Sequence, residues 1–327
     1  MTILKSLRDP QHTFIIAEIS GNHSGRRMKA ARLIEQAAAC GVDAVKFQTF
    51  DTDEIAAPGI SIPTGHDQDH DDWLKFHEVK TLRQLFEKGG LPREWHKELQ
   101  HVSYENGVEF ISTPFSVEAA KFLVEDIGVR VLKIASGDLT YVPLLQYAAK
   151  TLCEIIISTG GAHMHEVMKA VTIDLEQRCN HSGPHGKFSV TDVNVLQCIS
   201  SYPCPISVAN VGVVGRYKKW LPLGIGIGYS DHTLSDLVPV LAVTQGATII
   251  EKHFKMEGDE SAIDVGHSLG PLAFKQMVEK IRDIPLAMGW QDIKEPVDLE
   301  YHDRIWARRD PSDWLRPDQP AREGNWK

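Results

Sequence analysis

The sequence predicts an α/β protein of the (β/α)8, or TIM barrel, class. Eight short segments are rich in β-branched and other apolar residues at both alternating positions, which is typical of strands buried on both faces of a parallel sheet. Helical patterns lie between these segments, and several of them end at a glycine, as helices commonly do. A strand followed by a helix, repeated eight times, is the pattern of this barrel.

The predicted strands and helices alternate along the chain. The strands are residues 14–20, 43–49, 108–113, 130–136, 154–159, 194–200, 224–230 and 247–254. The clearest helices are residues 26–40, 91–107, 117–128, 234–246 and 271–288. An open doubly wound sheet is the structural alternative, but no GxGxxG motif opens a helix, and the glycines of segment 224–230 have the wrong spacing.

Two intervals between strands are longer than one strand and one helix require. They predict insertions after the second strand, at about residues 51–82, and before the sixth, at about residues 174–192. Loops that follow barrel strands build the active-site face of this fold. The first insertion is therefore the better candidate for a cover over a substrate.

Composition and charge exclude several classes of protein. Lys and Arg number 35 against 44 Asp and Glu, and the net charge of −9 disfavours nucleic acids and anionic membranes as partners. No apolar run approaches the roughly 20 residues that span a bilayer, and the N-terminus lacks the pattern of a secretory signal. The five cysteines form no CxxC pair, which favours a cytoplasmic location.

The last part of the chain differs in composition from the predicted barrel. We expect residues 1–289 to form the catalytic barrel and residues 290–327 to form a C-terminal extension that is no separate domain. This extension holds Trp290, Trp306, Trp314 and Trp326 together with Arg304, Arg308, Arg309, Arg316 and Arg322. Disordered tails are normally poor in aromatic residues, so we expect the extension to dock on a barrel, its own or that of a partner.

Two lysines lie inside otherwise apolar predicted strands. Lys46 and Lys133 would be buried there, and a buried ammonium group needs an anionic partner. One interpretation is an internal salt bridge with Glu18 or Glu251. The other is a cradle for phosphate and carboxylate groups, completed by nearby hydroxyls at Ser136, Ser158, Thr159 and Ser230.

Two histidines follow the ends of neighbouring predicted strands. His232 comes after the seventh strand, and His253 lies at the end of the eighth. Paired imidazoles at this edge suit a divalent metal ion with open positions that could polarise a carbonyl group. Each histidine could instead be a structural residue, as lone histidines commonly are.

Eight short motifs then carry a resemblance to a known family. They are FIIAEISGNHSG, DAVKFQTF, FISTPF, KIASGD, IISTGG, LQCISSYP, GYSDHT and IIEKHF. In this order, from about residue 12 to residue 290, the chain resembles the sialic acid synthase (N-acetylneuraminate synthase) family, which includes spore coat polysaccharide synthases. The resemblance implies a TIM barrel that condenses phosphoenolpyruvate with the open-chain aldehyde of an N-acetylated amino sugar, typically N-acetylmannosamine. Phosphate would be released, and a homodimer is expected.

The resemblance also implies a role for each matching residue. Phosphoenolpyruvate would be held by Lys46, Lys133, Ser136, Ser158 and Ser230. The metal ligands would be His232 and His253. Mn2+ is the expected ion, with Mg2+ or Co2+ as alternatives. Both histidines would be catalytic, as would Glu18, which would position or deprotonate reacting groups. The sugar hydroxyls would meet Gln48, Asp138, Tyr202 and Asp264.

The chain departs from the family pattern at four points. Asp138 replaces a glutamate, Ser200 stands where asparagine is common, and His267 is an added titratable group of unknown purpose. The antifreeze-like C-terminal domain, which in the family donates an arginine to the partner's sugar site, has no counterpart in this sequence. Two alternative functions stay open: a pyruvate aldolase that forms a Schiff base on a lysine, and a non-catalytic sugar-binding barrel.

Overall fold

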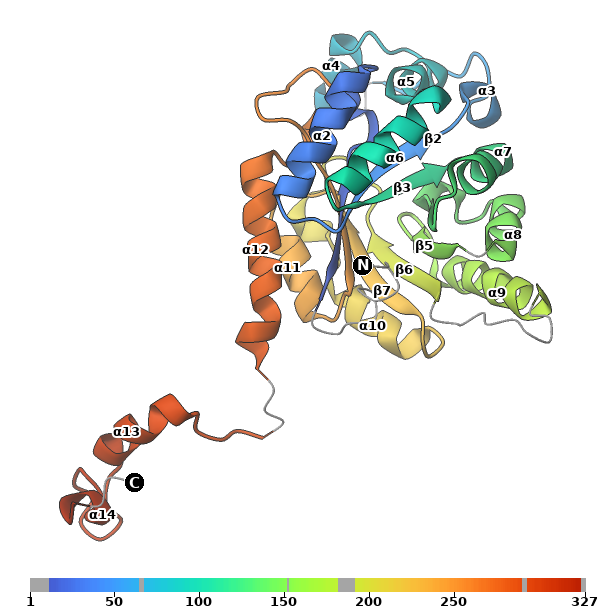
Figure 1. Cartoon of the computed structure of the whole chain (residues 1–327). Helices are drawn as coiled ribbons and strands as arrows, with labels where there is room; N and C mark the ends of the chain where they lie inside the picture. The colour runs from blue at the N-terminus through green and yellow to red at the C-terminus, as the bar shows by residue number, and fades with distance from the viewer. Residues whose placement is uncertain (1–11, 65–67, 152, 182–191, 290–292, 325–327) are drawn as a thin grey trace. The chain divides into compact units, whose positions relative to one another are not determined.

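The computed structural model describes residues 12–64, 68–151, 153–181, 192–289 and 293–324 (Figure 1). The chain divides into two compact units, Met1–Ile284 and Pro285–Lys327. In the first unit, eight parallel strands close into a barrel in sequence order, and β8 pairs with β1. The predicted TIM barrel is therefore confirmed.

Every predicted strand is present, with ends shifted by at most two residues. The strands are β1 (Phe14–Glu18), β2 (Ala44–Thr49), β3 (Glu109–Pro114), β4 (Val131–Ile134), β5 (Glu154–Ser158), β6 (Val193–Cys198), β7 (Gly226–Asp231) and β8 (Ile249–His253). The register pairs Glu18 of β1 with Lys46 on one side and with His253 on the other. The polar ends of different strands consequently meet at one end of the barrel.

Helices surround the barrel on the outside (Figure 1). They are α2 (Arg27–Ala39), α6 (His96–Glu105), α7 (Val117–Lys121), α8 (Val142–Lys150), α9 (Met164–His181), α10 (Gly212–Trp220), α11 (Leu237–Thr244) and α12 (Pro271–Met288). The insertion after β2 contains α3 (Thr52–Ile55) and α4 (Gln68–Phe76), and α5 (Leu82–Gly89) follows. The second predicted insertion begins within α9, and residues 182–191 lie outside the described part of the chain. No helix in the described ranges is long and apolar enough to cross a bilayer.

The barrel interior changes from apolar to polar along the strands. The apolar layer consists of Phe14, Ile16, Ala44, Ile111, Val131, Ile156, Leu196 and Ile249. Side chains alternate between the two faces of a strand, so the second residue after an inward-facing one faces inward as well. These next positions are polar and line a cavity: Glu18, Lys46, Thr113, Lys133, Ser158, Cys198 and Glu251.

The C-terminal unit has contacts of its own. It contains α13 (Asp298–Ala307) and α14 (Gln319–Arg322). The buried Asp310 carboxylate accepts hydrogen bonds from the backbone amides of Ser312 and Gln319, at 2.8 and 2.6 Å. Trp290 and Trp326 lie outside the described residues. Docking of this unit on a barrel stays a prediction.

One buried histidine ties the helix layer to the barrel. His96, at the start of α6, has a fully buried side chain whose Nδ1 donates to the Pro92 carbonyl at 3.2 Å. Its Nε2 lies 2.7 Å from the Thr49 hydroxyl, which must therefore donate. Burial lowers the pKa of His96 to about 4. Between about pH 4 and 6.5 the unfolded chain consequently binds a proton at this site that the folded chain does not.

We expect His96 to make the fold sensitive to acid. Because its pKa is lower in the folded state than in the unfolded state, stability is complete above about pH 6.5 and falls as the pH drops toward 4. Between pH 7 and pH 5, the free energy of unfolding should fall by about 1–2 kcal/mol less in His96→Gln than in the wild type. Urea denaturation at both pH values measures this change. His101→Gln, at an exposed position on the same helix, is the control, and equal pH dependence in all three proteins would contradict the assignment.

Candidate active site

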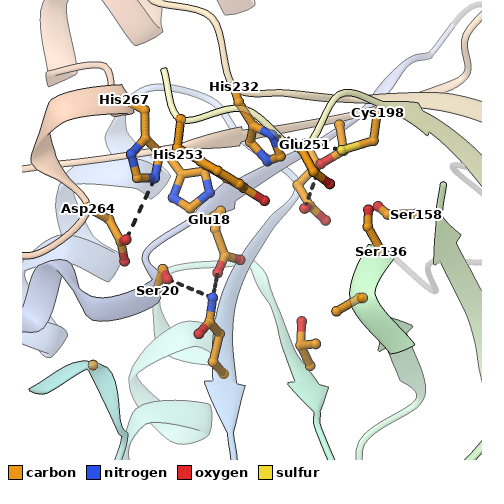
Figure 2. Close-up of a pocket in the computed structure, with 18 of the residues that line it drawn as sticks. Glu18, Ser20, Ser136, Ser158, Cys198, His232, Glu251, His253, Asp264 and His267 are labelled. Carbon is orange, nitrogen blue, oxygen red and sulfur yellow. Dashed lines mark hydrogen bonds and ion pairs between the residues drawn. The ribbon is translucent and has the colours of Figure 1, made fainter. Parts of the chain in front are cut away.

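A cavity of about 860 Å3 opens at the carboxyl ends of the strands (Figure 2). All eight strands contribute to it, through Glu18, Lys46, Thr113, Lys133, Ser158, Cys198, Ser230 and Glu251. Chemistry in TIM barrels takes place at this face. The cavity is therefore the candidate active site.

The segment after β2 supplies an apolar wall of the cavity. Trp73 of α4 and Leu85 and Phe86 of α5 line it, together with Phe50 and Phe115. The Phe50 ring centroid lies 5.5 Å from the centroids of both Phe86 and Phe115, in edge-to-face contacts that stabilise aromatic clusters. The insertion thus borders the cavity, as expected for a substrate cover.

Four buried charged side chains, Glu18, Lys46, Lys133 and Glu251, form a group that we call the floor cluster. The Lys46 ammonium lies 2.5 Å from Oε2 of Glu18 and donates to the Thr113 hydroxyl at 2.9 Å. Oε1 of Glu251 is 3.8 Å from Nζ of Lys46 and 3.5 Å from Nζ of Lys133. Both lysines therefore have internal carboxylate partners, which was one of the two alternatives that the sequence left open.

The floor cluster shifts the proton affinities of its members. Burial raises the pKa of Glu18 to about 7, because the attraction of Lys46 only partly offsets it. Burial also lowers the pKa of Lys133, although Glu251 opposes this shift. For Glu251, burial raises the pKa, but the two lysines outweigh it and hold the pKa below its usual value. Glu18 is therefore suited to exchange a proton near neutral pH.

Hydroxyl groups border the floor cluster on the side of β4 and β5. Ser136, in the short helix η4 (Ser136–Asp138), accepts a hydrogen bond from the Gly160 amide at 2.9 Å. The Ser158 hydroxyl is buried and has no hydrogen-bond partner within the described residues. A Cβ atom at Gly160 would lie 2.2 Å from the hydroxyl of Ser200 and 3.0 Å from that of Ser136. Glycine at position 160 therefore lets the backbone lie close to the side chains of Ser136 and Ser200.

We expect Gly160→Ala to displace the hydroxyls of Ser136 and Ser200. The added methyl group has no room, so the free energy of unfolding should fall by about 1–3 kcal/mol. Gly137→Ala is the matched control, because a Cβ atom there meets nothing within 4 Å. Chemical denaturation measures the stabilities, and a crystal structure of the variant shows the serine positions. Unchanged stability with undisturbed serines would contradict the close-approach argument.

The two predicted metal ligands lie together at the rim of β7 and β8, with ring centroids 5.5 Å apart (Figure 2). Nδ1 of His232 donates to the Ile199 carbonyl at 2.7 Å, which leaves the lone pair on Nε2. Nδ1 of His253 is buried and has no hydrogen-bond partner among the residues that the structure describes. Burial lowers the pKa of His232 to about 4 and that of His253 well below its usual value. Both imidazoles are therefore neutral at pH 7, as metal binding requires.

The donor set fits a divalent ion that keeps open positions. A histidine ligand typically donates its second ring N–H to a carbonyl or carboxylate, and His232 does so. Among the residues that the structure describes, no three His, Cys, Asp or Glu side chains already converge on one point. Two neutral nitrogens with space around them suit a metal whose remaining ligands come from substrate and water.

Three of the four predicted sugar-binding residues line the cavity: Gln48, Tyr202 and Asp264. The Gln48 amide donates to the Ser20 hydroxyl at 2.7 Å, and the Asp264 carboxylate accepts from the Gly21 amide at 2.8 Å. The Tyr202 ring centroid lies 4.1 Å from that of His232. Asp138 is not part of the lining; it lies partly buried in η4, where burial raises its pKa to about 6.

Three inward-facing residues of the cavity have no role in the predicted site. They are Glu251, which was predicted only as a possible salt-bridge partner, Cys198 and Thr113. Each lies two positions after an apolar residue of the inner layer, namely Ile249, Leu196 and Ile111. The period of two along each strand is therefore the signal that would have found them.

Several known proteins are similar to this chain over most of its length. A sequence profile described as the NeuB family matches residues 33–292. N,N'-diacetyllegionaminic acid synthase of Legionella pneumophila is 36% identical over 299 residues, which cover 90% of this chain and 78% of that protein. Spore coat polysaccharide biosynthesis protein SpsE of Bacillus subtilis is 32% identical, covering 87% of this chain and 70% of its own length. The crystal structure of N-acetylneuraminic acid synthetase from Leptospira borgpetersenii, in complex with citrate, matches with a TM-score of 0.71 and 30% identity, over 89% of this chain and 90% of that one.

Proposed function

The chain belongs to the NeuB family, and on this premise we propose that it condenses phosphoenolpyruvate with the aldehyde group of an N-acetylated amino sugar. The resemblance to sialic acid synthases is confirmed, and the chain is an enzyme that forms a carbon–carbon bond in the synthesis of sialic-type acids. The non-catalytic alternative is therefore dropped. Homodimeric assembly and a cytoplasmic location stay predictions from the sequence.

One observation carries the proposal: a single cavity holds two buried lysines and several hydroxyls below two neutral imidazoles. Phosphoenolpyruvate presents a phosphate and a carboxylate, which ammonium groups and hydroxyls bind well. With Glu18 protonated, the ammonium groups of Lys46 and Lys133 face only one carboxylate, so the floor cluster keeps one positive charge for the ligand. The hydroxyls of Ser136, Ser158 and Ser230 would complete the binding site.

The reaction forms one carbon–carbon bond and releases phosphate. The methylene carbon of phosphoenolpyruvate attacks the aldehyde carbon, and the aldehyde oxygen takes up the proton of Glu18 and becomes a hydroxyl group. Water then adds to the cation-like C2 atom, and Glu18, deprotonated in the first step, accepts the proton of the water. The C2–O bond to phosphate breaks as the new C2 hydroxyl loses its proton, leaving a keto acid. Gln48, Tyr202 and Asp264 would orient the sugar hydroxyls.

A divalent ion, with Mn2+ as the expected metal, would polarise the aldehyde carbonyl. His232 and His253 would hold it, because their neutral nitrogens lie at the rim above the floor cluster. The Ile199 carbonyl fixes the ring of His232 and its tautomer. The protein thus contributes the position and the protonation state of both ligands.

A Schiff-base aldolase is the second candidate, since burial lowers the pKa of Lys133, as an amine nucleophile requires. Lys133 also lines the cavity, which favours this candidate. Borohydride reduction in the presence of pyruvate would trap such an intermediate, and the mass of the protein would increase. Condensation of phosphoenolpyruvate forms no adduct on the protein that borohydride could reduce.

We expect turnover to depend on a divalent ion. Phosphate release from phosphoenolpyruvate should require both an amino sugar, such as N-acetylmannosamine, and added Mn2+. His232→Ala and His253→Ala should each abolish metal binding and turnover, while circular dichroism reports an intact barrel. Full activity in excess EDTA, with elemental analysis showing no residual metal, would refute the metal role.

We expect Lys133→Met to weaken binding of phosphoenolpyruvate. A charge-assisted hydrogen bond contributes about 1.5–3 kcal/mol, so affinity should fall at least about tenfold, or 1.4 kcal/mol. Calorimetric titration measures the change, with Lys150→Met at an exposed position of α8 as the control. Affinity equal to that of the control would make Lys133 a structural partner of Glu251.

A further inference from the structure

A third histidine lies beside the two predicted metal ligands. His267, at the end of the short helix η7 (Val265–His267), lines the cavity and is 8% exposed. Its ring centroid is 4.4 Å from that of His253 and 6.4 Å from that of His232 (Figure 2). No role for this residue follows from the sequence.

The spacing of the three rings matches the spacing of imidazoles around one ion. A histidine nitrogen about 2.1 Å from a metal places the ring centre about 3.2 Å away, so two rings lie about 4.5 Å apart at right angles and about 6.4 Å apart when opposite. The measured centroid distances of 4.4, 5.5 and 6.4 Å lie within this range or at its edge.

Two ring nitrogens of this group lack hydrogen-bond partners in the described part of the chain. Nε2 of His267 and Nδ1 of His253 are both buried without a hydrogen bond within the described residues. Nε2 of His267 faces Asp264, whose Oδ1 lies 3.7 Å away as an ion-pair partner, which is beyond hydrogen-bond distance (Figure 2). A buried polar atom without a partner is unfavourable. A cation between the rings would satisfy such lone pairs.

The backbone that carries His267 is held in place on both sides. The Ser268 hydroxyl donates to the Asp264 carbonyl at 2.5 Å and accepts from the Asn22 amide at 2.9 Å. The Leu269 amide donates to the His253 carbonyl at 3.0 Å, which ties the loop to β8. Rotation about the side-chain torsions of His267 can therefore move its ring without moving the loop.

We propose that His267 is a third protein ligand of the divalent ion held by His232 and His253. The inference rests on the metal part of the proposed function. The ring nitrogens do not already converge on one point in the described part of the chain, so the His267 ring turns toward the ion when the ion binds. A third imidazole raises the preference of the site for Co2+ over Mg2+, because nitrogen ligands favour later transition metals.

Titration of the full-length protein with Co2+ alone tests this proposal. Calorimetry gives the affinity, and visible absorption reports the ligands around the ion. We expect His267→Ala and His267→Phe to lower Co2+ affinity at least about tenfold and to change the Co2+ spectrum. His267→Phe keeps an aromatic ring against His253 and Tyr202, so a packing role predicts normal affinity in this variant. His101→Ala is the control for a distant, exposed histidine.

The outcomes separate this inference from the proposed function. If His232→Ala loses Co2+ but both His267 variants bind it as the wild type does, the third ligand is refuted and the two-histidine site stands. If the His267 variants change only the KM of the sugar, the inference is likewise refuted. If the wild type binds no Co2+, Mn2+ or Mg2+, both the inference and the metal role are refuted.

Discussion

The floor cluster is the constraint on which the rest of the site depends. Lys46 and Lys133 are 3% exposed, and their charges are tolerable only because Glu18 and Glu251 lie within 4 Å of them. These carboxylates come from β1 and β8, the strands whose pairing closes the barrel. The pairing that closes the barrel therefore also brings these two carboxylates to the lysines.

The cavity combines two kinds of chemistry. Ammonium and hydroxyl groups from β2, β4 and β5 suit an anionic ligand, whereas neutral imidazoles from the ends of β7 and β8 suit a metal. Burial produces both properties, because it keeps the histidines unprotonated and raises the proton affinity of Glu18. Aromatic side chains of the insertion after β2 border this polar interior with an apolar wall.

Much of this architecture could be predicted from the sequence. Eight buried strands with helices between them specify the barrel, and Lys46 and Lys133 stand out as charges in apolar strands. A salt bridge with Glu251 could be predicted as one alternative. That its single carboxylate lies near both lysines could not be predicted, because this depends on how β8 meets its neighbours across long stretches of chain. The position of Asp138 outside the cavity lining depends on the turn of η4, which strand periodicity does not describe.

A crystal structure with phosphoenolpyruvate and Mn2+ tests the central claim most directly, that the floor cluster and the two histidines form one catalytic site. The account predicts phosphate or carboxylate oxygens within hydrogen-bond distance of Nζ of both Lys46 and Lys133. It also predicts an anomalous peak for manganese beside His232 and His253. Phosphoenolpyruvate bound elsewhere, with the lysines still paired only to Glu18 and Glu251, would contradict the claim.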